Sequence, residues 1–100
     1  MAIQTEIKRV TLVVSAGANG GDYDVAIEST QTFDIGDRFG VPSKWRCVAA
    51  WYFPTDNLVA LGTVFHNIDV KPRLDDVDLT LRAKAGGRLQ IAVMAAFEHD

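Results

Sequence analysis

In the last quarter of the chain every second residue is apolar, and this period of two is the strongest constraint on its fold. The alternation covers residues 76–84 and 88–98, on either side of Ala85-Gly86-Gly87. Successive side chains of a β-strand point to opposite faces of a sheet, so a period of two is typical of a half-buried strand. The glycines favour a turn. The pattern therefore predicts one β-hairpin, whose apolar face carries Val77, Leu79, Leu81, Ala83, Leu89, Ile91, Val93, Ala95 and Phe97.

The N-terminal residues 3–14 predict another strand, but its apolar pattern changes phase. Ile3 and Ile7 share one parity, whereas the apolar residues from Val10 to Val14 share the other. A shift of one residue moves every side chain to the opposite face of a sheet. We therefore expect either a β-bulge near Lys8-Arg9 or a strand that crosses from one sheet to another.

The middle of the chain predicts shorter strands and one further hairpin. Residues 23–27 and 33–35 favour short strands, and residues 36–43 an irregular loop, because Pro42 cannot donate to a strand ladder. Residues 44–53 are apolar on both faces, residues 54–57 have turn chemistry, and residues 58–70 are expected to return as a long strand.

Together these patterns predict a single all-β domain over residues 1–100. The expected architecture is an antiparallel β-sandwich or a small jelly-roll-like barrel of six to eight strands. We expect at most one short helical turn, within residues 29–43. Ten of the thirteen acidic residues are Asp, which favours turns over helices. The predicted core comprises Val10, Leu12, Val25, Ile27, Trp51, Phe53, Val64, Leu79, Leu81, Ile91 and Val93.

Composition limits the classes of partner. The net charge of −3 is spread evenly, with five basic and six acidic residues in the first half and five and seven in the second. No basic stripe is present, so nucleic acid is not an expected partner. No apolar run is long enough to span a membrane, and the N-terminus does not read as an export signal. We therefore expect no membrane partner and synthesis in the cytoplasm.

The sequence contains no recognisable catalytic motif. Cys47 is the only thiol and lies on an apolar face, where a free cysteine behaves as a small hydrophobe. His66 shares the parity of Val64 and Ile68, which indicates a packed or hydrogen-bonded structural histidine, and His99 is expected to be solvated. We predict no enzymatic activity, no catalytic residue, no cofactor and no metal site.

Two acidic clusters leave cation binding open. They are Asp75, Asp76 and Asp78, and Asn19, Asp22 and Asp24. Loop oxygens of this kind can bind Ca²⁺, but neither cluster has the spacing of a twelve-residue calcium loop.

The best functional indication is a surplus of apolar faces. Residues 44–53 and 88–98 both carry apolar side chains on the face opposite the predicted core, and aromatic residues with Arg are typical of protein interfaces. This pattern predicts a structural subunit that associates with copies of itself or with other structural chains, such as a bacteriophage capsid, decoration or tail component of a virion. The expected interface residues are Arg46, Val48, Tyr52, Met94 and Ala96. Alternatively, the protein is a binding domain in which Trp51 and Tyr52 form a stacking platform for a small ligand or a carbohydrate. A separate alternative to the interface is that loop 29–43 covers part of the apolar surplus within the domain.

Overall fold

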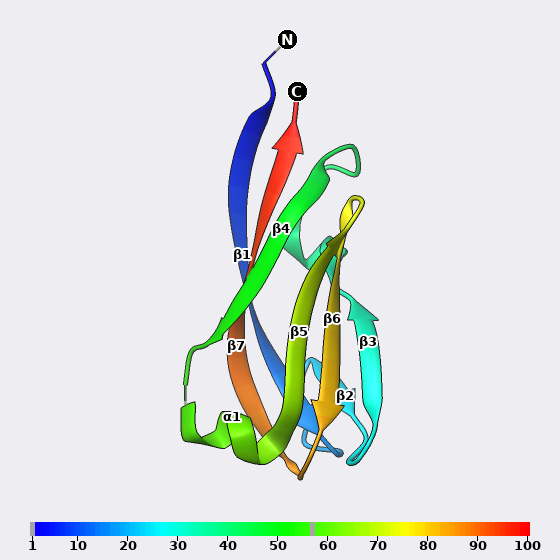
Figure 1. Ribbon diagram of the computed structural model, residues 1–100, viewed down its shortest axis with the longest axis vertical. Helices are drawn as coiled ribbons and strands as arrows, with labels where there is room; N and C mark the ends of the chain where they lie inside the picture. The colour runs from blue at the N-terminus through cyan, green and yellow to red at the C-terminus, as the bar shows by residue number, and fades with distance from the viewer. Residues whose placement is uncertain (1, 57) are drawn as a thin grey trace.

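The chain folds as an all-β sandwich, as the sequence predicts. The computed structural model describes residues 2–56 and 58–100, which form seven strands in two packed sheets (Figure 1). Sheet A has four strands in the order β2 (Tyr23–Val25), β1 (Gln4–Ala16), β7 (Gly87–His99) and β4 (Arg46–Pro54). Sheet B has three strands in the order β3 (Thr30–Asp34), β6 (Asp76–Ala83) and β5 (Phe65–Arg73). The 3-10 turn η1 (Gly36–Phe39) comes after β3, and the helix α1 (Leu58–Val64) precedes β5.

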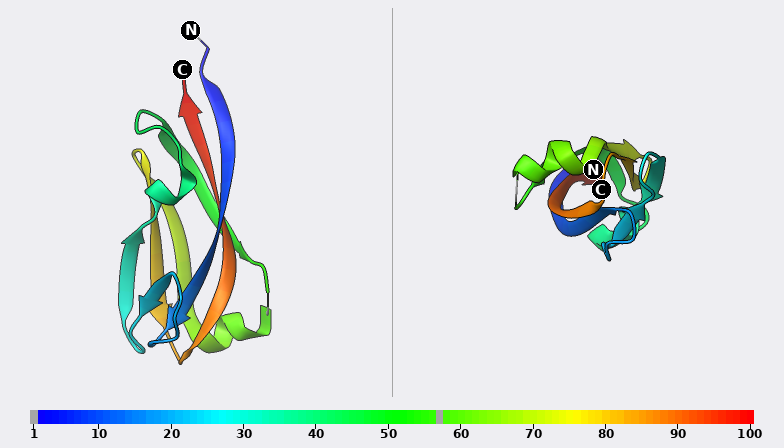
Figure 2. Two further views of the ribbon diagram at one scale, coloured as in Figure 1. Left: turned by 180° about the vertical axis from the view of Figure 1, so that it is seen from behind. Right: turned by 90° about the horizontal axis from the view of Figure 1, so that it is seen from below.

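Strands β1 and β7 form a long antiparallel ribbon that gives the molecule its length of 49 Å against widths of 21 and 19 Å. Their register runs without interruption from Gln4 opposite His99 to Ala16 opposite Gly87. Figure 2 shows the paired ends of this ribbon extending beyond the rest of the sandwich. The predicted bulge near Lys8-Arg9 is therefore absent, and β1 stays within one sheet. The change of apolar phase arises because Ile3 and Ile7 face solvent, with 65% and 59% of their surfaces exposed.

The predicted hairpin over residues 76–98 is wrong in its pairing, although both of its strands exist. Strand β6 belongs to sheet B and β7 to sheet A, so the connection between them crosses the sandwich. The amides of Lys84 and Ala85 donate to the Val64 carbonyl at the end of α1, at 2.8 and 3.2 Å. The hairpin that does form joins β5 to β6, and its turn places Leu74 in a left-handed conformation with φ of 57°.

The predicted hairpin over residues 44–70 is also wrong. Residues 58–64 form α1 instead of a strand, and this helix carries the chain from β4 in sheet A to β5 in sheet B. A short apolar run cannot be assigned to helix or strand from its pattern alone. The prediction of at most one helical turn is therefore wrong, because α1 is present in addition to η1. The 3-10 turn η1 does lie within the predicted range 29–43. Of the predicted 54–57 turn, Asn57 lies outside the described residues.

The core fills the space between the two sheets. Seven of the predicted core residues are buried, namely Leu12, Val25, Val64, Leu79, Leu81, Ile91 and Val93. Val10 is half-buried and packs against them. Three predictions are wrong: Ile27, Trp51 and Phe53 are 49%, 41% and 41% exposed. Ile27 lies beyond the end of β2, and the two aromatic residues face outward because β4 contains a register shift between Cys47 and Ala49.

Candidate interaction surface

Sheet A carries a group of apolar side chains on the face that points away from the core. Cross-strand partners share a face, and the register pairs Trp51 with Met94 and Phe53 with Ala92. These positions alternate with the inward Val93 and Tyr52. We call this surface the outer apolar face and define it by Ala49, Trp51, Phe53, Ala92, Met94 and Ala96.

A β-bulge in β4 decides which aromatic side chains lie on the outer apolar face. Cys47 pairs with Phe97 and Ala49 pairs with Ala96, so Val48 is an extra residue with no partner on β7. One extra residue reverses the facing of every later residue in the strand. Cys47 faces the core before the bulge, and Tyr52 does so after it. The sequence pattern does not predict this bulge, because it assigns residues 44–53 to a regular strand.

The predicted interface residues are divided by this bulge. Arg46 pairs with Glu98 on the outward side, Val48 is 39% exposed at the bulge, and Met94 and Ala96 lie on the outer apolar face. Tyr52 is half-buried and packs against the core, where burial raises the pKa of its hydroxyl. The predicted set thus shares one outward surface except for Tyr52, and the aromatic residues on that surface are Trp51 and Phe53.

The outer apolar face has a basic border on β1. The Arg9 guanidinium carbon lies 5.4 Å from the centroid of the Phe53 ring, within the range of a cation–π contact. The exposed Ile7 lies next to Arg9 on the same side, opposite Ala96 in the ladder. Aromatic, small apolar and Arg side chains are thus combined on one surface, a composition typical of interfaces.

The outer face of sheet B is entirely different, because it is polar along all three strands. Arg73, at the end of β5, is the centre of an ion-pair network on this face: its Nε lies 3.1 Å from an Asp78 carboxylate oxygen, and an Nη lies 3.8 and 3.9 Å from oxygens of Asp76 and Asp34. The Thr32 and Thr80 hydroxyls hydrogen-bond at 2.8 Å beside this network. The two sheets of one small domain therefore differ in the kind of surface that they present to solvent.

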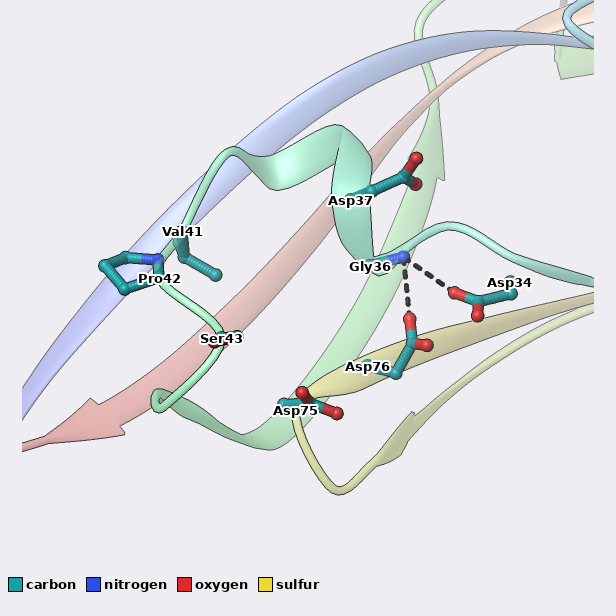
Figure 3. Close-up of a pocket in the computed structure, with 8 residues that line it drawn as sticks. All are labelled: Asp34, Gly36, Asp37, Val41, Pro42, Ser43, Asp75 and Asp76. Atoms are coloured by element: carbon teal, nitrogen blue, oxygen red, sulfur yellow. Dashed lines mark hydrogen bonds between the residues drawn. The ribbon is translucent and has the colours of Figure 1, made fainter.

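An open pocket of about 470 Å³ lies where β3, η1 and the β5–β6 turn meet. In Figure 3 the carboxylates of Asp34 and Asp76 converge on the amide of Gly36, which donates to them at 3.2 and 2.8 Å. A hydrogen bond to Asp76 raises the pKa of Asp34. Burial acts to raise the pKa of Asp76, but hydrogen bonds from Asp34 and from the Val77 and Gly36 amides outweigh it and lower that pKa. The Gly36 amide and Arg73 therefore hold the Asp34 and Asp76 carboxylates in a structural network.

The second acidic cluster also holds its own loop together. Asp22 accepts a hydrogen bond from the Val13 amide at 2.8 Å, and Asp24 accepts from the Gly21 amide at 2.9 Å and from the Ser15 hydroxyl. Among the described residues, no three His, Cys, Asp or Glu side chains are arranged to hold a metal ion.

The residues considered for acid–base or thiol chemistry are dispersed. Cys47 is 5% exposed, its thiol donates to the Ala49 carbonyl at 3.4 Å, and burial raises its pKa. The prediction that His66 is packed is wrong, because it is exposed next to a register shift between Phe65 and Asn67. His99, predicted to be solvated, instead stacks on Trp45 at 4.0 Å between ring centroids and lies 2.6 Å from a Glu6 carboxylate oxygen.

Comparison of the chain with protein-family models, with curated proteins and with solved structures finds no match. Within the described residues, no helix has the length and apolar character of a membrane span. Evidence for function therefore comes from the surfaces of this molecule alone.

Proposed function

We propose that this protein is a non-enzymatic structural subunit that associates with other protein chains through the outer apolar face. The observation that supports it is the contrast between the two sheets. Sheet B covers its outer face with ion pairs and threonines, as a surface that stays in water would, whereas sheet A exposes 41% of both Trp51 and Phe53. Contiguous exposed apolar surface is uncommon on soluble monomers and is typical of interaction sites.

The composition of the outer apolar face favours a protein as its partner. Trp and Arg are enriched among the residues that dominate interface energies, and small residues around them allow a close approach. Ala92 and Ala96 are 0% and 8% exposed beneath this surface, so the larger rings stand above a shallow floor. Trp51 and Phe53 replace Tyr52 as the proposed anchors, while Arg46, Val48, Met94 and Ala96 keep their proposed roles at the contact.

We propose that the subunit belongs to a repeating protein assembly. The proposed class is the capsid, decoration and tail components of bacteriophage virions. Support comes from the small all-β fold and from its one apolar outer face. Copies of itself or other structural chains are the proposed partners, and neither a cofactor nor a catalytic residue forms part of the proposal.

A stacking platform made by Trp51 and Tyr52 is not favoured. The two rings point to opposite faces of β4, because Trp51 pairs with the outward Met94 and Tyr52 with the buried Val93. A carbohydrate ring needs aromatic surfaces on one side. The side chains that share a face, Trp51 and Phe53, lie instead beside Arg9, which occupies the space over the Phe53 ring.

Light scattering coupled to size-exclusion chromatography tests the proposal. The wild-type chain should exceed its monomer mass of 10.9 kDa, and Trp51→Lys should lower the mass of the assembly by removing this contact, while the far-ultraviolet circular dichroism spectrum stays unchanged. Leu74→Lys is the matched control, because Leu74 is 78% exposed on the β5–β6 turn, away from the outer apolar face. A wild-type chain that remains monomeric at its highest attainable concentration, and that captures no structural partner through Trp51, contradicts the proposal.

A further inference from the structure

The N-terminal half of β1 is an edge strand without a neighbour. Strand β2 pairs with β1 only at Val14, Ser15 and Ala16, so among the described strands the edge from Gln4 to Leu12 has none beside it. Figures 1 and 2 agree that this half of β1 forms an outer margin of the molecule. An open edge presents unpaired backbone groups and can pair with another strand.

Two hydrogen bonds show which backbone groups point to this edge. The Val13 amide donates to Asp22 Oδ2 at 2.8 Å, and the Val13 carbonyl accepts from the Asp22 amide at 2.7 Å. Both groups of Val13 therefore point away from β7. In an antiparallel ladder this direction alternates with every residue, and the β1–β7 register is unbroken. The open amides and carbonyls consequently belong to the odd-numbered residues Thr5, Ile7, Arg9 and Thr11.

We propose that the β1 edge pairs antiparallel with the β1 edge of a second copy of this chain, in the register that places Ile7 opposite Ile7. This pairing joins the two A sheets into one continuous sheet through a two-fold axis. It is separate from the contact proposed for the outer apolar face and does not depend on it.

The charges of the edge and the length of the overlap select this register. The open backbone groups meet only if odd-numbered residues lie opposite odd-numbered residues. The two-fold axis must then pass through a residue that lies opposite its own copy, which is called the centre of the register. A centre at Thr5 would pair only residues 4–6 of β1, and a centre at Val10 would place Ile7 opposite Val13, whose backbone groups are bonded to Asp22. Centres at Glu6, Lys8 or Arg9 place like charges directly opposite each other, which is destabilising. The centre at Ile7 instead places Glu6 of each copy opposite Lys8 of the other.

The structure also positions these side chains for pairing. Glu6 lies 2.6 Å from His99 Nε2, and Lys8 Nζ lies 5.9 Å from the centre of the Trp45 ring, so both are held on the inward side of the ribbon. Ile7, on the other side, is 59% exposed and would meet its own copy as an apolar pair. The overlap from Gln4 to Val10 ends before Val13, whose open groups Asp22 already occupies.

Inward-pointing charges can also protect an edge from pairing, and a protective pattern would place repelling charges opposite each other. Here the acidic and basic residues are spaced two apart, with Ile7 between them, so self-pairing neutralises them. This self-complementarity favours a second copy over an unrelated strand.

A charge-exchange experiment tests the register. All variants are made in the Trp51→Lys background, which removes the outer apolar face as a source of association. Glu6→Lys and Lys8→Glu should each weaken dimerisation at least about tenfold, because each creates like-charged opposite pairs. The double variant Glu6→Lys/Lys8→Glu exchanges the charges and should restore the dimer to within about threefold. Glu28→Lys, an exposed acid-to-base change beyond β2, is the control for net charge and should leave the dimer intact.

Amide hydrogen exchange gives a readout that does not depend on substitutions in the edge. The amides of Thr5, Ile7, Arg9 and Thr11 should exchange rapidly at low concentration and gain protection as the dimer forms. Amides of the even-numbered neighbours should be protected throughout by β7. A Trp51→Lys chain that stays monomeric, a dimer whose odd amides remain unprotected, or a double variant that fails to recover would each overturn the proposal. None of these results bears on whether wild-type Trp51 mediates a separate contact.

Discussion

Truncation of Phe97 measures how much the packing of sheet A stabilises the fold. Phe97 is 0% exposed, and among the described residues it is the largest fully buried side chain. It lies on β7 between Glu6 of β1 and Cys47 of β4, and its ring meets Phe39 of η1 at 5.6 Å and 63°. Replacing a buried Phe with Ala costs about 3–5 kcal/mol. We expect the upper part of this range, because β1 is held in an unbroken ladder on one side of Phe97 and Cys47 pairs with it on the other, which limits the collapse of the cavity.

The edge-to-face contact with Phe39 should account for about 0.5–1.5 kcal/mol of that loss. A total stability of about 5–15 kcal/mol is usual for a domain, so Phe97→Ala should leave a fold of marginal stability. The milder variant Phe97→Leu is therefore the one to combine with Phe39→Leu in a double-mutant cycle. Urea unfolding is followed by tryptophan fluorescence and circular dichroism in the Trp51→Lys background, at protein concentrations low enough for the chain to be monomeric, so that association does not contribute to the free energies. A loss below about 1 kcal/mol for Phe97→Ala would show that this ring does not anchor the core, and a cycle with no coupling would rule out the Phe39 contact.

Three further changes test particular features of the structure. Deletion of Val48 should leave a folded chain in which Trp51 remains accessible to an aqueous quencher. The deletion removes the unpaired bulge residue, so residues 49–54 should keep the faces on which they lie. A buried Trp51 would contradict the bulge assignment. Burial raises the pKa of the Cys47 thiol in the folded protein, so the thiol of the unfolded chain ionises first, near about pH 8.5, and stability is lost as the pH rises through this value. Cys47→Ala should reduce this loss. Equal slopes of the free energy of unfolding against alkaline pH for variant and wild type would count against this. Gly36→Ala should lower the unfolding midpoint, because a Cβ there would lie 2.9 Å from the Asp76 Cα, and a midpoint equal to that of the wild type would show that the loop adapts freely.

The candidate surface was only partly predictable from the sequence. The alternation of residues 88–98 correctly placed Met94 and Ala96 on the face away from the core, because β7 is regular throughout its length. The same rule placed Trp51 inward and Tyr52 outward, which the bulge at Val48 reverses. The sequence around Val48 is apolar on both sides, so no polar residue signals the extra position.

The open edge of β1 was also hidden in the sequence. The alternation of residues 3–14 predicted a strand, but it did not show that β2 would pair with only the last three residues of that strand. Whether an edge is open depends on where other strands end in space, which is a property of the whole fold.

Local patterns in the sequence were enough to define the class of the fold and the positions of most strands, because alternation and turn chemistry act between residues that are close along the chain. The pairing of the strands was settled by tertiary packing. Ala85-Gly86-Gly87 can close a hairpin or carry the chain from one sheet to the other, and it is packing against Val64 and the shared core that selects the crossing. The apolar run at 58–64 became a helix for a related reason, since the chain must pass there from sheet A to sheet B. Pairing and facing are set by contacts between distant segments, and a local pattern carries no information about which distant segment will be its neighbour.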